Sequence, residues 1–144
     1  MTINKKFIIH NINELDEVAN FIIKISKNSK IFYLTGDLGS GKTTLVQKIC
    51  KILGSKDTVV SPSFALVNIY DSKVGDIYHI DLYRLNDIEE IINLGIEDYL
   101  YNSNYCFVEW PQLLKNISPE LYYEININII DNNSRKIEIL LKEN

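Results

Sequence analysis

The segment from Gly36 to Thr43 carries the residues whose types and spacing point most directly to chemistry. Its letters, GDLGSGKT, fit the pattern G-x-x-x-x-G-K-[ST] without a gap, which is typical of a loop that holds a polyphosphate chain. In such a loop the glycines let backbone N–H groups converge on one concavity, the lysine neutralises phosphate oxygens and the threonine hydroxyl ligates Mg²⁺. We therefore predict a nucleotide and Mg²⁺ site lined by Asp37, Leu38, Gly39, Ser40, Gly41, Lys42, Thr43 and Thr44.

Hydrolysis of a bound nucleotide also needs a carboxylate that positions the metal. Two apolar segments end in an acid, Ile77 to Asp81 and Tyr105 to Glu109. The second is the more uniformly apolar, as expected of a central parallel strand, and its acid falls at the carboxyl end, where α/β sheets bind ligands. We favour Glu109 as the Mg²⁺ ligand and a catalytic group, with Asp81 as a second acidic contributor. A solvated carboxylate at a strand end is the alternative for each acid.

Two further polar residues near these acids could take part. His79 could act as a base, but a single histidine on a strand is more often hydrogen-bonded within the fold, and we favour that interpretation. The chain has only two arginines, Arg84 and Arg135. Arg84 could offer its guanidinium to a γ-phosphate, and a structural ion pair with Asp81 or Glu90 is an equal alternative.

A short segment between the predicted phosphate-loop helix and the following strands has features of a nucleotide-sensing switch. The residues from Ser61 to Phe64 place two hydroxyls around a proline, in the position where other proteins with this loop keep such a switch. An ordinary loop is the alternative. Trp110, the only tryptophan, follows Glu109 and is open to interpretation as core filler or as a contact to a partner.

The elements that must position these residues follow from hydrophobic periodicity, which alternates between strand-like and helix-like segments and therefore predicts an α/β fold. The apolar strand before the glycine-rich loop and the amphipathic helix after it argue against a chance match in a turn. The expected elements are a first, edge-type strand at Phe7–Ile9, a helix from Leu15 to near Lys27, a strand at Ile31–Leu34, a helix that stops at Gly54, a hairpin of Ala65–Tyr70 with Asp76–Leu82, two short helices within 87–101, a strand at Tyr105–Val108 and a closing antiparallel pair between Leu121 and Leu141.

Length and composition limit the class of protein. The 144 residues, 46% of them hydrophobic, suffice for a single domain spanning 1–144. A net charge of −4 argues against a protein that wraps nucleic acid, so we expect no DNA partner. Cys50 and Cys106 lack the spacing of a disulfide framework or zinc site, and no apolar run is long enough to span a membrane. We expect a cytoplasmic protein without membrane contact.

The sequence resembles the TsaE family, also called YjeE, small bacterial P-loop ATPases required for making threonylcarbamoyladenosine on tRNA. Five blocks occur in the family's order and spacing over most of the chain. They are Gly36 to Leu45, Ser61 to Phe64 followed by Leu66-Val67, His79 to Leu85, Leu94 to Tyr99 and Val108 to Pro111.

This resemblance implies a P-loop NTPase-type three-layer fold with a mixed, largely parallel central sheet and an antiparallel C-terminal pair. It implies ATP and Mg²⁺ as ligands and TsaD and TsaB as protein partners in the modification of tRNA at position 37, so that tRNA is reached only indirectly. By the same resemblance Thr43 and Glu109 take the Mg²⁺ roles and Lys42 the phosphate role, and the segments Ser61 to Phe64 and Asp81 to Arg84 take switch-like roles near the γ-phosphate. We count Asp81 as a further candidate metal ligand, and Lys42, Glu109 and Asp81 as the candidate catalytic residues. Ser63 and Arg84 fall in the switch-like segments.

Three positions near the ends of the chain bear on the base of the nucleotide. The family has a serine and a threonine four residues apart near the adenine, and Asn11 and Leu15 stand at the matching positions here. Apart from these positions, Ser63 in the Ser61 to Phe64 segment stands where the family has a threonine, and it keeps the hydroxyl. Arg135 matches a basic position near the C-terminus, and we include it with Asn11 among the predicted nucleotide contacts.

Three functions are compatible with these features. We favour an ATPase that is slow alone, because a chain with two arginines has few candidates for an arginine finger, and a finger supplied by a partner is worth about 10³–10⁵-fold in rate. A small P-loop kinase is the first alternative, although two arginines leave little from which to build a lid. An ATP-sensing module without hydrolysis is the second.

Overall fold

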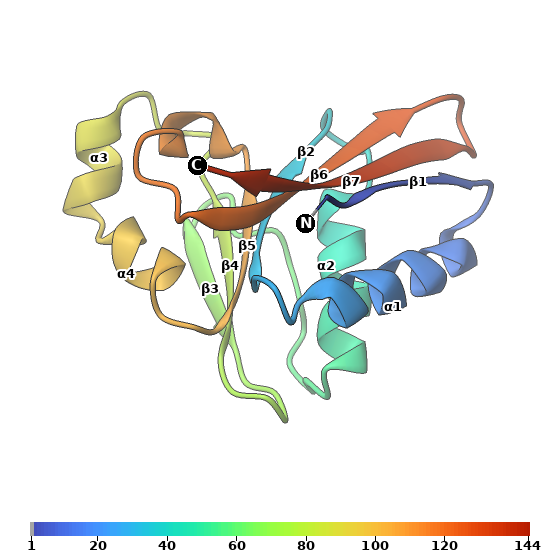
Figure 1. Cartoon of the computed structure of the whole chain (residues 1–144), viewed down its shortest axis with the longest axis horizontal. Coiled ribbons are helices and arrows are strands. Elements are labelled where there is room, and N and C mark those ends of the chain that lie inside the picture. Colours follow the sequence, from blue (N-terminus) through green and yellow to red (C-terminus); the bar gives the residue numbers. More distant parts are fainter. Residues whose placement is uncertain (1) are drawn as a thin grey trace.

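The computed structural model describes residues 2–144, which form a seven-stranded sheet between two layers of helices (Figure 1). The strand order is β1-β7-β6-β2-β5-β4-β3, and the four strands β6, β2, β5 and β4 are parallel. The expected α/β class with a mixed sheet is therefore confirmed. The strands are β1 (Asn4–Ile9), β2 (Ile31–Thr35), β3 (Val67–Tyr70), β4 (Ile77–Asp81), β5 (Tyr105–Glu109), β6 (Leu121–Ile129) and β7 (Arg135–Glu143).

The helices follow the periodicity of the sequence. Figure 1 shows α1 and α2 on one side of the sheet and α3 and α4 on the other, and each pair covers its own buried apolar cluster. The α-helices are α1 (Leu15–Ile25), α2 (Lys42–Ile52), α3 (Ile88–Asn93) and α4 (Ile96–Leu100), with 3₁₀ turns at Ile12–Glu14 (η1) and Pro111–Leu114 (η2).

The central and outer strands differ in their burial patterns, because helices cover both faces of the central strands and one face of the outer ones. All residues of β4 and β5 are buried, since helices cover both of their faces, and their sequences are correspondingly rich in apolar residues. The strands β6 and β7 alternate between buried and more accessible residues, because helices pack on one of their faces only.

The outer parts of the sheet agree with the expected elements. The hairpin of β3 and β4, the two short helices α3 and α4, and the antiparallel pair of β6 and β7 are confirmed. The first strand lies at the sheet edge and pairs antiparallel with β7. Within residues 2–144 there is no helix of the length and apolar character that a bilayer crossing needs.

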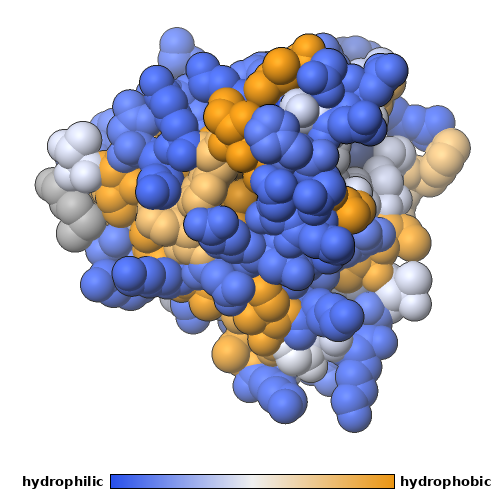
Figure 2. Space-filling model, turned by 90° about the vertical axis from the view of Figure 1, so that its right-hand side faces the viewer, coloured by the Kyte–Doolittle hydropathy of each residue, from blue (hydrophilic) through white to orange (hydrophobic). Residues whose placement is uncertain are grey.

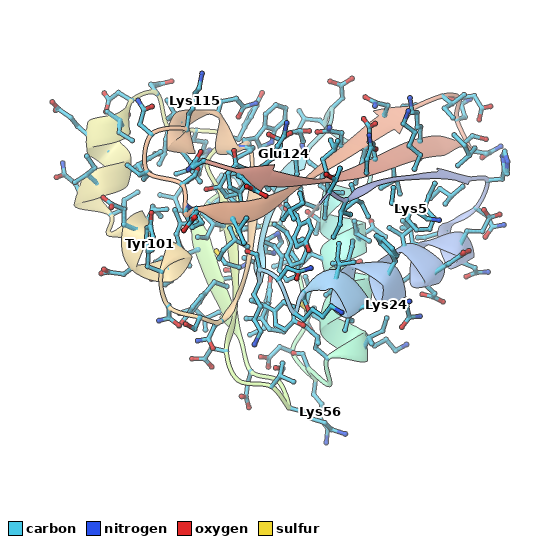
Figure 3. The ribbon with its side chains drawn as sticks, in the orientation of Figure 1. Lys5, Lys24, Lys56, Tyr101, Lys115 and Glu124 are labelled. Atoms are coloured by element: carbon cyan, nitrogen blue, oxygen red, sulfur yellow. The ribbon has the colours of Figure 1, made fainter. Side chains whose placement is uncertain are left out.

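The surface is largely hydrophilic, with apolar groups in separate areas, on the side of the molecule that Figure 2 presents. Four of the labelled side chains in Figure 3 are lysines: Lys5 on β1, Lys24 on α1, Lys56 after α2 and Lys115 near η2. They extend from different elements in different directions, so these four do not combine into one basic face.

Candidate nucleotide-binding site

The glycine-rich loop leaves the carboxyl end of β2 and enters α2 at Lys42. Gly36 has φ +154°, and a Cβ there would lie 2.6 Å from the Ile127 carbonyl oxygen. Gly41 caps α2 with φ +113°, a conformation that side chains disfavour. Only glycine lets the backbone turn this closely against β6. The loop therefore forms a concave surface between the carboxyl end of β2 and the N-terminus of α2.

Lys42 is the charged group at the centre of the loop, and its side chain is almost fully buried, with 5% exposed. Its Nζ donates to the Gly36 carbonyl oxygen at 2.5 Å and lies 3.8 Å from the centre of the Trp110 ring. Burial lowers the pKa of Lys42, while the carboxylates of Glu109 and Asp81 act to raise it. A buried ammonium beside an aromatic ring and a carbonyl is prepared to bind an anion.

The two predicted acids lie side by side, because β4 and β5 are parallel neighbours and Asp81 is the register partner of Glu109. Both side chains are about 3% exposed. Thr43 Oγ1 donates to Glu109 Oε2 at 3.0 Å, and Ser63 Oγ donates to Asp81 Oδ2 at 3.1 Å. Hydroxyl and carboxylate oxygens form the donor set that Mg²⁺ prefers, so Thr43 and Glu109 fit this ion.

His79 is hydrogen-bonded inside the fold, as we expected, and its partner is one of the two acids. The ring is fully buried, with Nε2 2.6 Å from Glu109 Oε2 and Nδ1 3.0 Å from the Tyr70 hydroxyl. The Tyr70 hydroxyl is in turn 3.0 Å from the Val60 carbonyl oxygen. Burial raises the pKa of Tyr70, so its hydroxyl keeps its proton.

A cavity of about 300 Å³ brings most of these groups together. Trp110 and Tyr83 contact each other at its wall, with ring centres 4.8 Å apart and ring planes inclined by 48°. Arg84 does not line it: its guanidinium lies over the Phe64 ring at 4.2 Å, and no ion pair joins Arg84 to either predicted acid partner among the described residues. We call this space the Lys42 cavity; its lining is Leu38, Gly39, Gly41, Lys42, Thr43, Thr44, Ser61, Ser63, Asp81, Tyr83, Glu109 and Trp110.

A second cavity, of about 380 Å³, lies on the other side of the loop, and we call it the Arg135 cavity. Asn11 lines it and accepts a hydrogen bond from the Asn13 amide at 3.0 Å. Arg135 Nε donates to the Ser40 carbonyl oxygen at 3.1 Å and Nη1 to the Asp131 carbonyl oxygen at 2.9 Å. Arg135 therefore ties the glycine-rich loop to the β6–β7 turn.

The loop residues themselves divide between the two cavities. Gly39, Gly41 and Thr44 line both, while Ser40 lines the Arg135 cavity alone. The Ser40 hydroxyl is buried and has no hydrogen-bond partner within residues 2–144. Asp37, the remaining predicted loop residue, accepts a hydrogen bond from the Ser40 amide through its carbonyl oxygen at 3.0 Å and lines neither cavity.

Sequence reasoning missed the groups that join these residues. The bond of the Tyr70 hydroxyl to His79, the contact of Tyr83 with Trp110 and the contact of Trp110 with Lys42 depend on side chains from separate strands and loops. The sequence did hold a signal for Tyr83, because this residue lies two positions after Asp81, just beyond the end of β4. For Tyr70 the sequence held no signal except its position in the alternating pattern of β3.

Comparison with known proteins finds relatives over most of this chain. The family model described as "Threonylcarbamoyl adenosine biosynthesis protein TsaE" matches residues 9–137. The chain belongs to the TsaE family. Among the curated TsaE proteins, that of Rickettsia typhi is 39% identical over 94% of this chain and 96% of its own length. The TsaE protein of Bacillus subtilis is 32% identical over 88% of this chain and 79% of its own.

A solved structure extends the TsaE comparison to the fold. The crystal structure of YdiB from Bacillus subtilis superposes with a TM-score of 0.78 and 26% sequence identity, covering 97% of this chain and 86% of that one. The region from Gly36 to Trp110, which carries the Lys42 cavity, lies wholly inside the part matched by the TsaE family model.

Proposed function

We propose that this TsaE protein binds ATP with Mg²⁺ and hydrolyses it slowly, in the biosynthesis of threonylcarbamoyladenosine on tRNA and together with TsaD and TsaB. The observation that carries the proposal is the meeting of Thr43 Oγ1 and Glu109 Oε2, 3.0 Å apart, on the wall of a cavity that also contains Lys42. A phosphate chain in the glycine-rich loop would meet the Lys42 ammonium, the N-terminus of α2 and a metal held by oxygen atoms.

The placement of the two arginines supports slow turnover by the isolated chain. Arg84 is stacked on Phe64 and Arg135 is bonded to backbone carbonyls on the far side of the loop. Neither guanidinium lines the Lys42 cavity. No arginine of this chain would therefore be in place to stabilise the charge that develops on the γ-phosphate. A partner that supplies an arginine would accelerate hydrolysis by about 10³–10⁵-fold.

Exposed apolar side chains around the Lys42 cavity support the association with partner proteins. Leu38 and Tyr83, in its lining, are 67% and 54% exposed, and Phe64, on the adjoining segment, is 84% exposed. Exposed aromatic and aliphatic groups beside a ligand site are typical of protein interfaces. A net charge of −4 suits a protein that reaches tRNA through such partners.

The test is phosphate release by the purified chain with Mg²⁺ and ATP, alone and with TsaD and TsaB at saturation. We expect low release alone and a large rise on mixing. Unchanged release at saturating partners would contradict the proposed coupling. If ATP binds with no release under either condition, the ATP-sensing alternative is correct, and transfer of phosphate to a small acceptor instead of water would establish the kinase.

A further inference from the structure

The guanidinium of Arg135 is hydrogen-bonded to three backbone carbonyl oxygens. Its Nε donates to the Ser40 carbonyl oxygen at 3.1 Å, and its Nη1 donates to the carbonyl oxygens of Asp131 and Ser134 at 2.9 and 3.1 Å. Within residues 2–144 no carboxylate forms an ion pair with this guanidinium. One of the three carbonyls belongs to the glycine-rich loop, so Arg135 acts directly on the backbone of that loop.

The backbone of Arg135 is held in place by the sheet. Arg135 is the first residue of β7, and it pairs with Ile9 of β1 on one side and with Ile129 of β6 on the other. The turn of residues 131–134 beside it is closed by two hydrogen bonds to Asp131 Oδ1, each 2.9 Å long. The guanidinium therefore extends from a well-ordered part of the fold to the loop.

The hydrogen bond to Ser40 sets the direction of the N–H group that follows. No peptide bond of the described chain is cis, and in a trans peptide the C=O and the next N–H point in opposite directions. The Ser40 carbonyl points to Arg135, which lines the Arg135 cavity and not the Lys42 cavity. The Gly41 N–H therefore points away from Arg135, to the concave side of the loop, where Gly41 also lines the Lys42 cavity.

The loop itself does little to fix the peptide between Ser40 and Gly41. Gly41 has φ +113°, and glycine adopts positive and negative φ about equally readily, so no side chain opposes rotation of this peptide. The Ser40 hydroxyl is buried and has no partner among the described residues. The Ser40 amide is bonded to the Asp37 carbonyl oxygen at 3.0 Å, which fixes the preceding peptide. In the part of the chain that the structure describes, Arg135 makes the only hydrogen bond to the peptide between Ser40 and Gly41.

We propose that Arg135 is a positioning residue for the phosphate chain, because it orients the peptide between Ser40 and Gly41 so that the Gly41 N–H faces the phosphates. The inference rests on the proposed nucleotide function and assigns Arg135 a task at the phosphate end of the nucleotide. A donor that is already oriented loses less conformational entropy on binding than one that must first rotate into place. Loss of Arg135 therefore weakens phosphate binding, although the guanidinium lies outside the Lys42 cavity.

Two other roles of Arg135 would have different consequences. If the guanidinium contacted the base or the ribose, its removal would weaken the binding of ATP and leave that of inorganic tripolyphosphate unchanged. If it attracted the phosphates through its charge, every neutral substitution would weaken the binding of both. Orientation of the peptide needs an N–H donor at the position of Nε, with or without a charge. Glutamine supplies this donor, because its Nε2 lies as many bonds from Cα as the Nε of arginine does.

The first test measures the affinity of the purified chain for ATP and for inorganic tripolyphosphate, each with Mg²⁺, by calorimetry. In Arg135→Ala we expect both affinities to fall by the same factor, about tenfold, the effect of one weakened hydrogen bond to a charged group. In Arg135→Gln we expect both to fall by no more than about threefold. Lys136→Ala is the matched control and should bind as the wild type does, because it removes a positive charge from the next residue of β7, whose side chain points to the opposite face of the sheet.

The outcomes of this test separate the three roles. A loss of affinity for ATP alone in Arg135→Ala would show a contact with the base or the ribose and would overturn the proposal. Equal losses in Arg135→Ala and Arg135→Gln would assign the effect to the charge and would overturn it too. If the wild type binds neither ligand, the proposed nucleotide function fails. If it binds both and Arg135→Ala binds them as tightly, this inference alone fails.

The second test observes the peptide itself, in the free protein, by nuclear magnetic resonance. The dipeptide Ser-Gly occurs once in the chain, at 40–41, so labelling with [1-¹³C]serine and [¹⁵N]glycine assigns the Gly41 amide. We expect an order parameter of about 0.85 for this amide in the wild type and in Arg135→Gln, and one below about 0.6 in Arg135→Ala. The signals of the other glycines show whether each variant is folded. A Gly41 amide that is as well ordered in folded Arg135→Ala as in the wild type would overturn the proposal.

Discussion

The two cavities beside the glycine-rich loop are built in different ways. The Lys42 cavity is formed by buried charged groups at the ends of parallel strands, with Asp81 and Glu109 in register on β4 and β5. The Arg135 cavity combines the ends of β1, β6 and β7 with turn residues such as Asn11, which bonds to its own local backbone. The comparison teaches that strand register fixes the acidic groups of the Lys42 cavity, while the polar groups of the Arg135 cavity also depend on local turn conformation.

The largest effect is expected from Glu109→Gln, which removes a charge from the Lys42 cavity and keeps its shape. We expect phosphate release with partners to fall by about 10²-fold or more, as for loss of a group that acts on the reacting atoms, with ATP affinity within about threefold. Release assays and calorimetry with an ATP analogue measure the two. If the affinity for ATP fell by the same factor as the rate of phosphate release, Glu109 would contribute to binding alone.

Lys42→Ala is expected to act on binding. Removal of a hydrogen bond from a charged group to phosphate costs about 1.5–3 kcal/mol, so affinity for ATP should fall by about 10- to 100-fold. Trp110, 3.8 Å from the Lys42 ammonium, should report binding by its fluorescence in the wild type. Lys48→Ala on the same helix, where Lys48 pairs with Asp16 at 3.1 Å, is the control and should bind as the wild type does.

Gly36→Ala tests the close approach of the glycine-rich loop to β6. The new methyl group would lie 2.6 Å from the Ile127 carbonyl oxygen, so we expect the free energy of unfolding to fall by about 1–3 kcal/mol. Gly39→Ala, with φ +79° and open space around its Cβ, should lose only about 1–2 kcal/mol for the backbone conformation. Urea denaturation compares the two, and a larger loss at Gly39 would contradict the close approach.

Arg135→Ala should affect the Arg135 cavity and leave the Lys42 cavity working. Because the guanidinium donates to the carbonyls of Ser40 and Asp131, we expect about 1–2 kcal/mol less stability. Affinity for ATP should fall by roughly tenfold or less, with kcat nearly unchanged. A collapse of kcat with retained affinity would show that the two cavities are not separable.

The smallest effect is expected at Asp131, in the turn beside the Arg135 cavity. Hydrogen bonds from the Asn133 amide and from Ser134 lower the pKa of this carboxyl. A lowered pKa in the folded state stabilises the protein above the unfolded pKa, near 4, and this contribution disappears as the pH falls through the folded value. Asp131→Asn should therefore be slightly less stable than the wild type at pH 7 and equally stable at pH 2.5, as measured by the midpoints of urea denaturation. Equal losses would exclude the charge as the cause.

Sequence reasoning predicted the placement of residues best where it depends on contiguous segments. The structure brings the loop from Gly36 to Thr43 and the acids at the ends of two apolar strands to one cavity, and the sequence allowed this placement to be predicted because parallel strands end at one edge of the sheet. Prediction was incomplete for Arg84, whose guanidinium lies on Phe64 outside the cavity. Such a placement depends on how a loop folds back, which sequence spacing does not encode.

By itself the sequence determined the order of strands and helices, the place of the glycine-rich loop and the acids that end the buried strands, because each depends on periodicity or on neighbouring residues. The tertiary structure alone decided that β4 lies beside β5 with Asp81 opposite Glu109, that Trp110 covers Lys42 and that Tyr70 bonds to His79. These contacts join residues from separate elements, and their geometry exists only after the sheet has brought the strands into register.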